Sequence, residues 1–275
     1  MNLAMLLNKA EFPRSRDYDH DWMLDNQMGP NALWLTEWLC NGLELKPGMR
    51  VLDLGCGRAM SSVFLAREFG VSVWAADLWI GPERNQARAE AAGVGDRVTA
   101  LRMEAHAIPF ATAFFDAVVS VDSYQYFGTD VLYLNYLSRF VRTGGQFGVV
   151  VPGLMQPIER EVPNHLLQPQ ANGKPFWEAD CWSFNTVEFW RTHWSRCDAV
   201  TAVAVDSLPD GWRHWRDFEQ ALESSGKGVF PSDVEALDRD QGRYIGLVRM
   251  LARRGDHEPY NLYDPSLGIQ AGVDG

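Results

Sequence analysis

A glycine-containing turn directly after an apolar strand pattern is the stretch of this sequence best suited to hold a ligand. Residues 51–54 (Val-Leu-Asp-Leu) read as a short strand, residues 55–57 (Gly-Cys-Gly) follow at once, and a helical pattern begins near Ser61. Glycine lets the backbone turn through positive φ and lets a ligand approach the main chain, while the start of a helix offers unpaired N–H groups. The sequence therefore predicts a nucleotide-type site at the carboxyl end of this strand.

An acidic residue at the end of the next strand pattern narrows the choice of ligand. Asp77 follows the apolar segment 71–76, about 20 residues after the glycine turn, where a carboxylate can accept hydrogen bonds from both hydroxyls of a ribose. NAD and S-adenosylmethionine both satisfy this requirement. The turn lacks the third glycine of the dinucleotide fingerprint Gly-x-Gly-x-x-Gly, because Met60 stands in that place. The segments that follow must therefore decide between the two cofactors.

Alternating strand and helix patterns predict the fold that positions these residues. Strand patterns occupy 51–54, 71–76, 98–102, 115–121, 145–151, 199–205 and 244–251. Helical patterns occupy 61–69, 83–92, 131–140, 212–222 and 234–240, and another begins after Asn31, a residue type suited to an N-cap. Strands that alternate with helices indicate a right-handed parallel α/β unit. We expect an α/β domain with seven strands.

We expect a single domain over residues 1–255 with two additions. Residues 152–197 break the rhythm with five prolines and four tryptophans, and so long a connection between strands five and six is typical of a substrate cap. Residues 1–30 form either a lid over the ligand or a partly ordered tail. Residues 256–275 are polar, with glycine and proline, and read as a loosely held tail.

Composition excludes several classes of partner. The chain has 36 acidic and 25 basic residues, a formal charge of −11, and no basic block, which argues against nucleic acid and against an anionic membrane surface. Its four cysteines form no Cys-x-x-Cys pair, so we expect neither a metal site nor a disulfide framework, and a reducing cytoplasm fits best. The apolar residues 1–7 are too short for a membrane span and lack a cleavage site, so we expect no targeting segment.

Five segments in a fixed order carry a resemblance to a known family. Together they resemble the class I S-adenosylmethionine-dependent methyltransferases, especially the small-molecule type 11 group that is similar to the ubiquinone and menaquinone C-methyltransferases. The matching segments span most of residues 48–151 and are 51–57, 76–78, 104–110, 115–120 and 137–145. The resemblance implies a Rossmann-like, seven-stranded, mostly parallel sheet with helices on both faces and an antiparallel last strand. It also implies S-adenosyl-L-methionine as the methyl donor.

The resemblance places the methionine part of the donor against the glycine turn. It implies that Gly55 and Gly57 leave room for this part and that Asp53 lies near its amino group. Cys56 reads as a small filler in the tight turn rather than a nucleophile. The backbone around Val121 should lie near the sulfonium.

The resemblance also assigns residues to the adenosine part. Asp77 would bind the ribose hydroxyls and Leu78 would pack on the adenine face. Glu104 would accept a hydrogen bond from the adenine amino group, and the N–H of Ala105 would meet a ring nitrogen. The family more often has aspartate in place of Glu104, so the reach of this side chain differs here. We expect His106 to be structural or to line the cofactor site.

The methyl acceptor should enter beside residues 122–126, which follow the fourth strand. They lack the Asn/Asp-Pro-Pro-Tyr/Phe pattern of enzymes that methylate amino groups of nucleic-acid bases. Four aromatic residues form either a pocket for an amine or a flat ring or part of the packed core: Tyr124, Tyr126, Trp177 and Trp182. The candidate bases are His165 in the cap and Asp122, whereas His193 and His214 read as exposed or structural.

The sequence thus predicts an enzyme that moves a methyl group from S-adenosylmethionine to a small organic acceptor at O, N or C by in-line displacement. Alternatives are a cyclopropane-synthase-like enzyme acting on lipid, disfavoured because no basic amphipathic helix is evident, and a non-catalytic S-adenosylmethionine-binding protein. An NAD-dependent oxidoreductase is disfavoured by the missing third glycine. The sequence identifies neither the methyl acceptor nor the oligomeric state, and a homo-oligomer is one possibility.

Overall fold

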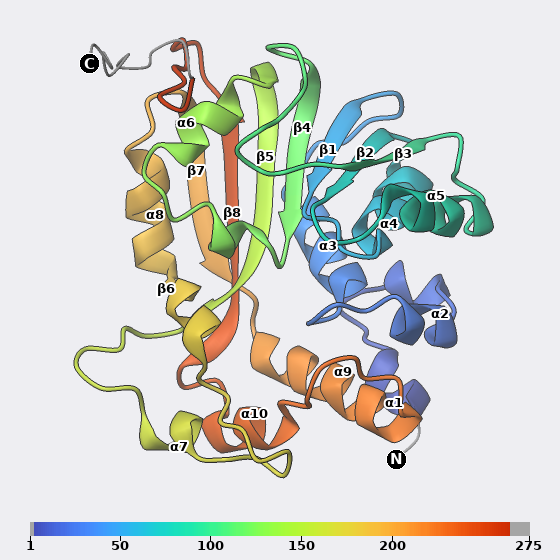
Figure 1. Ribbon diagram of the computed structural model, residues 1–275, viewed down its shortest axis with the longest axis vertical. Helices are drawn as coiled ribbons and strands as arrows, with labels where there is room; N and C mark the ends of the chain where they lie inside the picture. The colour runs from blue at the N-terminus through green and yellow to red at the C-terminus, as the bar shows by residue number, and fades with distance from the viewer. Residues whose placement is uncertain (1–2, 265–275) are drawn as a thin grey trace, which may run out of the picture.

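One sheet forms the centre of the molecule. The computed structural model describes residues 3–264, and its main sheet has the order β3-β2-β1-β4-β5-β8-β7 (Figure 1). The first five of these strands run parallel, while β8 is antiparallel to both β5 and β7. The strands of this path are β1 (Arg50–Leu54), β2 (Ser72–Asp77), β3 (Val98–Arg102), β4 (Phe115–Val121), β5 (Val141–Leu154), β7 (Val200–Ser207) and β8 (Ile245–Arg254).

The predicted fold class is confirmed, with one addition. All seven predicted strands are present, and the last is antiparallel as expected. An eighth strand, β6 (Asn185–Thr186), pairs with the end of β5. It has only two residues, too few for a period-2 pattern to be visible in the sequence. Strand β5 begins at Val141 rather than 145, because Val141 already pairs with Phe115 ahead of a register shift.

Alternating side chains of the strands feed two separate hydrophobic clusters, one on each face of the sheet. Val51 belongs to one cluster and Leu52 to the other, and Val119 and Val118 divide in the same way. Helices α3 (Ala32–Cys40), α4 (Met60–Phe69), α5 (Pro82–Ala91) and α9 (Gly211–Ser225) contribute to the first cluster. Helices α6 (Tyr133–Ser138) and α8 (Val187–Ser195) contribute to the second. Both faces are thus covered, which is why the central strands are apolar almost throughout.

Local signals explain where the helices begin and end. The side chain of Asn31 accepts hydrogen bonds from the amides of Leu33 and Trp34 and so caps α3. Helix α4 ends at Gly70, which adopts the left-handed conformation that suits glycine at this position. Helix α6 is shorter than the predicted 131–140, since the chain turns at Arg139 and Phe140 to enter β5.

A layer of short elements lies beyond the carboxyl ends of the parallel strands. In the lower part of Figure 1, α10 (Val234–Asp240) packs on α9, and α7 (Asn164–Leu167) packs on α10. The predicted cap, 152–197, supplies α7, the 3₁₀ turn η3 (Ala179–Ser183) and β6 to this region, whereas its last part, α8, packs on β7. A capping role for 152–197 stays a prediction.

The two ends of the described chain are both packed. Helices α1 (Leu3–Leu7) and α2 (His20–Asp25) lie near the lower layer, and Lys9 forms an ion pair with Asp217 of α9. The predicted tail, 256–275, is described only as far as residue 264. In that part, the amide of Tyr260 donates to Asn135 Oδ1 at 2.7 Å and the hydroxyl of Tyr263 donates to Asp130. Between residues 3 and 264, no helix is long and apolar enough to cross a membrane.

Candidate active site

A cavity of about 670 Å³ opens at the carboxyl ends of β1, β2 and β4. Its wall combines the glycine turn, the end of β2, residues 103–105 and 121–123, the N-terminal segment 26–30, the cap and α9. A crevice outside the carboxyl ends of parallel strands is the usual ligand site of an open α/β sheet. The volume falls within the range of small-molecule sites.

The glycine turn forms one end of this cavity and is tied to β2. The amides of Gly55 and Cys56 both donate to the carbonyl of Ala76, at 2.8 and 3.0 Å. Gly55 has a φ of +75°, and a Cβ at this residue would overlap Ser123 Oγ. Glycine is therefore required there for two reasons, the backbone conformation and the close approach of Ser123, which follows β4. Burial raises the pKa of the Cys56 thiol well above its usual range, so the thiol stays protonated.

Asp53 lies behind the turn and does not line the cavity. It is fully buried, and its Oδ2 accepts hydrogen bonds from Ser61 Oγ at 2.6 Å and Ser62 Oγ at 2.5 Å. These two hydroxyls stand in the first turn of α4. Burial raises the pKa of Asp53 to about 6 in spite of both hydrogen bonds. The observed contacts of Asp53 thus join β1 to α4, and its predicted place beside the amino group of the donor stays a prediction.

Asp77 holds the chain around the cavity with both carboxylate oxygens. Its Oδ2 accepts from the amide of Gly57 at 2.9 Å, and its Oδ1 accepts from the amides of Trp79 and Ile80, both at 2.8 Å. Oδ1 thus uses both of its lone pairs, whereas Oδ2 keeps one that can accept from a ribose hydroxyl. Leu78 and Trp79 line the cavity and are largely exposed, at 50% and 75%.

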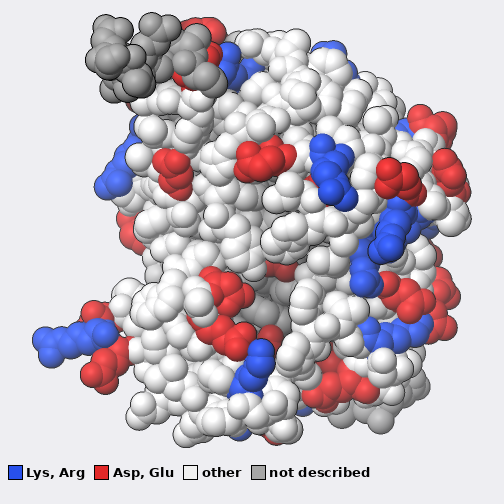
Figure 2. Space-filling model, viewed as in Figure 1, with Lys and Arg blue, Asp and Glu red and all other residues white. Residues whose placement is uncertain are grey.

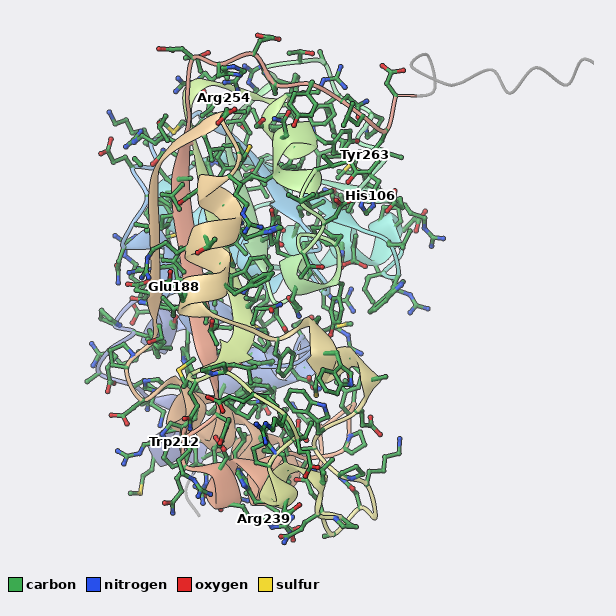
Figure 3. The ribbon with its side chains drawn as sticks, turned by 90° about the vertical axis from the view of Figure 1, so that its left-hand side faces the viewer. His106, Glu188, Trp212, Arg239, Arg254 and Tyr263 are labelled. Carbon is green, nitrogen blue, oxygen red and sulfur yellow. The ribbon has the colours of Figure 1, made fainter. Side chains whose placement is uncertain are left out.

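Glu104 and Ala105 also line the cavity, while the next residue turns away from it. Glu104 Oε2 accepts from the amide of His106 at 2.8 Å, and Oε1 lies 3.0 Å from His106 Nδ1. The imidazole packs edge-on against Tyr133 and Tyr263, with ring centroids 5.0 and 5.3 Å away. Figure 3 shows His106 and Tyr263 close together. Through its two contacts with the carboxylate, His106 holds the Glu104 side chain in place from outside the cavity.

Asp122 lines the cavity, directly after Val121. Its φ is +54°, an uncommon conformation for a residue other than glycine. Its amide donates to the carbonyl of Val150 at 2.8 Å, and its Oδ1 accepts from Gln125 Nε2 at 3.1 Å. Burial, together with the nearby Asp180 and in spite of the bond from Gln125, raises the pKa of Asp122 to about 7. This carboxyl group is poised to exchange a proton near neutral pH.

The N-terminal segment closes one side of the site over Asp122. Gly29 has a φ of +131°, and a Cβ there would overlap Asp122 Oδ2. Asn26, Met28 and Pro30 line the cavity beside it. The lid role predicted for 1–30 stays a prediction, but part of this segment forms a wall of the cavity.

Two of the predicted catalytic residues are not brought to the cavity. Tyr124 is completely buried in the core, where it packs against Trp190 and Trp194. His165 lies 2.8 Å from Asp240 Oδ1 through its Nε2, and neither His165 nor Tyr124 lines the cavity. Position in sequence beside the acceptor region did not reveal which way these side chains point.

Of the remaining predicted aromatic residues and histidines, one lines the cavity and the others lie in the core or at the surface. Tyr126 lines the cavity, whereas Trp177 is buried outside it and Trp182 is 67% exposed. His193 and His214 are both buried, and His193 Nε2 lies 2.9 Å from the carbonyl of Gly128. For both histidines the structural reading fits these positions.

Sequence reasoning missed the residues that line the half of the cavity away from the glycine turn. They are aromatic and acidic side chains from three separated segments, namely Phe176, Glu178, Asp180, Phe184, Trp215, Glu219 and Asp233. One signal was available for Glu219. It follows Phe218 and lies between Trp215 and Leu222 on the apolar face of α9, where a carboxylate is out of place. From Leu3 to Asp264, no group of three or more His, Cys, Asp or Glu side chains is arranged to hold a metal ion.

Comparisons with known proteins agree with this architecture. A family model described as "Methyltransferase domain" matches residues 51–145. The chain is 29% identical to the methyltransferase GfsG of Streptomyces halstedii over 136 residues, which cover 46% of this chain and 48% of that protein. It is 34% identical to a demethylmenaquinone methyltransferase of Mycobacterium sp. (strain KMS) over 122 residues, or 44% and 49% of the two chains. The chain thus spans about half the length of the curated relatives it matches.

A solved structure extends the likeness of the fold beyond the matched segment. The geranyl diphosphate C-methyltransferase of Streptomyces coelicolor A3(2), solved with Mg²⁺, geranyl diphosphate and S-adenosyl-L-homocysteine, superposes with a TM-score of 0.58 at 17% identity. The superposition covers 86% of this chain and 88% of that one. Residues 51–145 therefore match a methyltransferase domain, and the chain around them shares the fold of this solved methyltransferase, in agreement with the resemblance to the class I S-adenosylmethionine-dependent methyltransferases.

Proposed function

We propose that this chain transfers a methyl group from S-adenosyl-L-methionine to a small organic acceptor. The observation that carries the proposal is that one cavity, of about 670 Å³, has all the predicted donor residues except Asp53 at one end and a second, differently lined half at the other. A donor and an acceptor must share one enclosed space for in-line transfer. The matched methyltransferase domain supports the same reading.

The residues present fit the donor. The space that a Cβ would fill at Gly55 is held open by glycine, and the lone pair that the amide partners leave free on Asp77 Oδ2 suits a ribose hydroxyl. Leu78 and Met103 supply apolar surface for a flat base. S-adenosylmethionine, when bound, supplies an electrophilic methyl group on a sulfonium. The protein's task is then to orient the acceptor, exclude water and, where needed, accept a proton at the Asp122 carboxylate.

The alternatives are less well supported. A non-catalytic binding protein requires the acceptor half to be filled, whereas here that half is part of the cavity. For a cyclopropane-synthase-like enzyme on lipid, the acidic lining opposes an anionic phospholipid surface. An NAD-dependent oxidoreductase is opposed by the matched methyltransferase domain and by Met60 in place of the third glycine.

The proposal includes a location and leaves assembly open. All four cysteines are free and buried, which suits a reducing compartment, so a cytoplasmic location is part of the proposal.

Binding and turnover experiments test the proposal in two steps. Calorimetric titration of the full chain with S-adenosylhomocysteine and with NAD should show binding only of the former, and tight binding of NAD would refute the cofactor assignment. Release of S-adenosylhomocysteine is then measured with S-adenosylmethionine and a broad panel of phenols, amines and carbon acids. Donor binding without turnover of any acceptor would favour the non-catalytic alternative.

A further inference from the structure

The half of the cavity away from the glycine turn is strongly acidic. Five carboxylate side chains line it, namely Asp122, Glu178, Asp180, Glu219 and Asp233, and we call this region the acidic half. They come from four places in the chain, the end of β4, the cap, helix α9 and the residue before α10. Figure 2 shows acidic side chains gathered around a hollow in the lower centre of the face turned toward the viewer.

In the described part of the chain, most carboxylates of the acidic half have no basic side chain beside them. Across residues 3–264, Glu178 is the one member with an ion pair, at 3.7 Å from Lys174, and both side chains are more than half exposed. The cavity wall has one further basic residue, Arg58, which donates to the carbonyl of Asp25. The carboxylates act on one another instead, since Asp180 raises the pKa of both Asp122 and Asp233.

Glu219 is the clearest unpaired member. Only 8% of its surface is exposed, it lines the cavity, and it lies on the buried face of α9 beside Trp215. Burial, followed by the charge of Asp233, raises its pKa to about 8. Taking a carboxylate out of water without a cation beside it is destabilising. Such a group, in a cavity, is typical of a site whose ligand supplies the missing charge.

Aromatic rings complete the wall of the acidic half. Phe176 lies between Phe184 and Trp215, with centroid distances of 6.5 and 5.9 Å, and all three line the cavity. The negative faces of aromatic rings attract cations, most strongly when both are shielded from water. Carboxylates and aromatic faces in one cavity therefore favour an organic cation and repel phosphate or carboxylate groups.

We infer that the methyl acceptor is an organic amine, bound as a cation in the acidic half, whose nitrogen receives the methyl group. This inference rests on the proposed function. Glu219 and Asp233 bind the positive charge, the rings of Phe176 and Trp215 enclose the hydrocarbon part, and Asp122 lies at the reacting end, next to Val121.

The chemical step balances with groups already in the site. The ammonium gives one proton to the Asp122 carboxylate and becomes a neutral amine. The nitrogen lone pair then forms a C–N bond to the methyl carbon as the C–S bond breaks, and the sulfonium becomes a neutral thioether. The methylated amine carries the positive charge that the sulfonium loses, so the acidic half stabilises the product cation as well.

The first experiment compares acceptors that differ only in charge. Benzylamine, benzyl alcohol and benzoate form one matched set and hexylamine, hexanol and hexanoate another, each titrated into the complex with S-adenosylhomocysteine and assayed for turnover with S-adenosylmethionine. We expect saturable binding and methylation of amines alone. If the complex forms but no amine binds, or an alcohol or carboxylate is preferred, the inference is wrong while the proposed function stands. Failure to bind S-adenosylhomocysteine instead counts against the proposed function itself.

The second experiment removes single charges. Glu219→Gln and Asp233→Asn should each raise the KM of the amine by about tenfold or more, because a hydrogen bond to a charged group is worth ~1.5–3 kcal/mol, with unchanged affinity for S-adenosylhomocysteine. Glu223→Gln, one turn along the same helix, exposed and outside the cavity, is the matched control and should behave as the wild type. Equal KM values for Glu219→Gln, Glu223→Gln and the wild type would overturn the inference.

Discussion

At the scale of single residues, carboxylates of one type have three different tasks in this site. Asp53 is buried behind the turn and joins β1 to α4, Asp77 accepts from three backbone amides and keeps one free lone pair in the cavity, and Asp122 lies in the wall with an elevated pKa. Environment rather than residue type distinguishes these three carboxylates. Only the structure reveals these environments.

Replacing Asp77 tests the donor end directly. We expect Asp77→Ala to weaken binding of S-adenosylhomocysteine by about 1–3 kcal/mol, because it removes the acceptors for the ribose hydroxyls and releases the amide of Gly57. Calorimetric titration measures the change. Asp96→Ala, at an exposed residue outside the cavity, is the control. Affinity unchanged by the first substitution would remove Asp77 from the site.

At the scale of elements, the parallel strands and their helices were predictable because each carries its own local signal. Strand β4 is a run of apolar residues, and α4 and α10 have clear periodic patterns and ends. The acidic half has no such signal, since Glu219 and Asp180 meet only through long-range packing of α9 against the cap. The orientation of Tyr124 was hidden for the same reason. Its ring turns into the core against α8, an element that is distant in sequence.

Substituting Gly29 tests whether the N-terminal segment positions Asp122, and it does so without changing a charged residue. We expect Gly29→Ala to lower turnover by about tenfold or more, since the new Cβ would displace the Asp122 carboxylate, and tenfold corresponds to ~1.4 kcal/mol in the transition state. Gly173→Ala is the control, because Gly173 also has a positive φ but a Cβ there meets nothing within 4 Å. Both variants should lose some thermal stability through backbone strain, whereas only the first should lose turnover. Equal turnover in the two variants would show that the N-terminal segment does not position Asp122.

At the scale of the whole molecule, the formal charge of −11 is not spread evenly over the surface. Many exposed carboxylates are paired, as in Arg249 with Asp206 and Arg216 with Asp238. Among the residues that the structure describes, Asp122, Glu219 and Asp233 have no basic partner and line the cavity, where burial raises their pKa values. The protein thus concentrates electrostatic strain at one site, and that strain makes its stability depend on pH in a particular direction.

The pH dependence of stability follows from Glu219, Asp122 and Asp233. Their pKa values in the folded protein are about 8, about 7 and about 6, against ordinary values of 4.5, 3.8 and 3.8. The folded state therefore binds more protons than the unfolded state between roughly pH 4 and pH 8, so stability falls as pH rises through this window and levels off above it. Asp233 and Glu223 raise the pKa of Glu219 further, whereas hydrogen bonds from Trp215 and from the backbone of Asp233 lower it.

Removing that one group should flatten the pH profile. We expect Glu219→Gln to match the wild type near pH 5 and to be more stable by about 2 kcal/mol near pH 8.5, because the variant has no charge to bury. Thermal unfolding at both pH values measures this, and the melting temperature should rise by several degrees only at the higher one. Asp96→Asn, at an exposed residue outside the cavity, should keep the wild-type slope. A loss of stability at both pH values would mean that Glu219 is a satisfied structural group, and would also weaken the case for a cation in the acidic half, since a ligand that supplies positive charge must relieve this same cost.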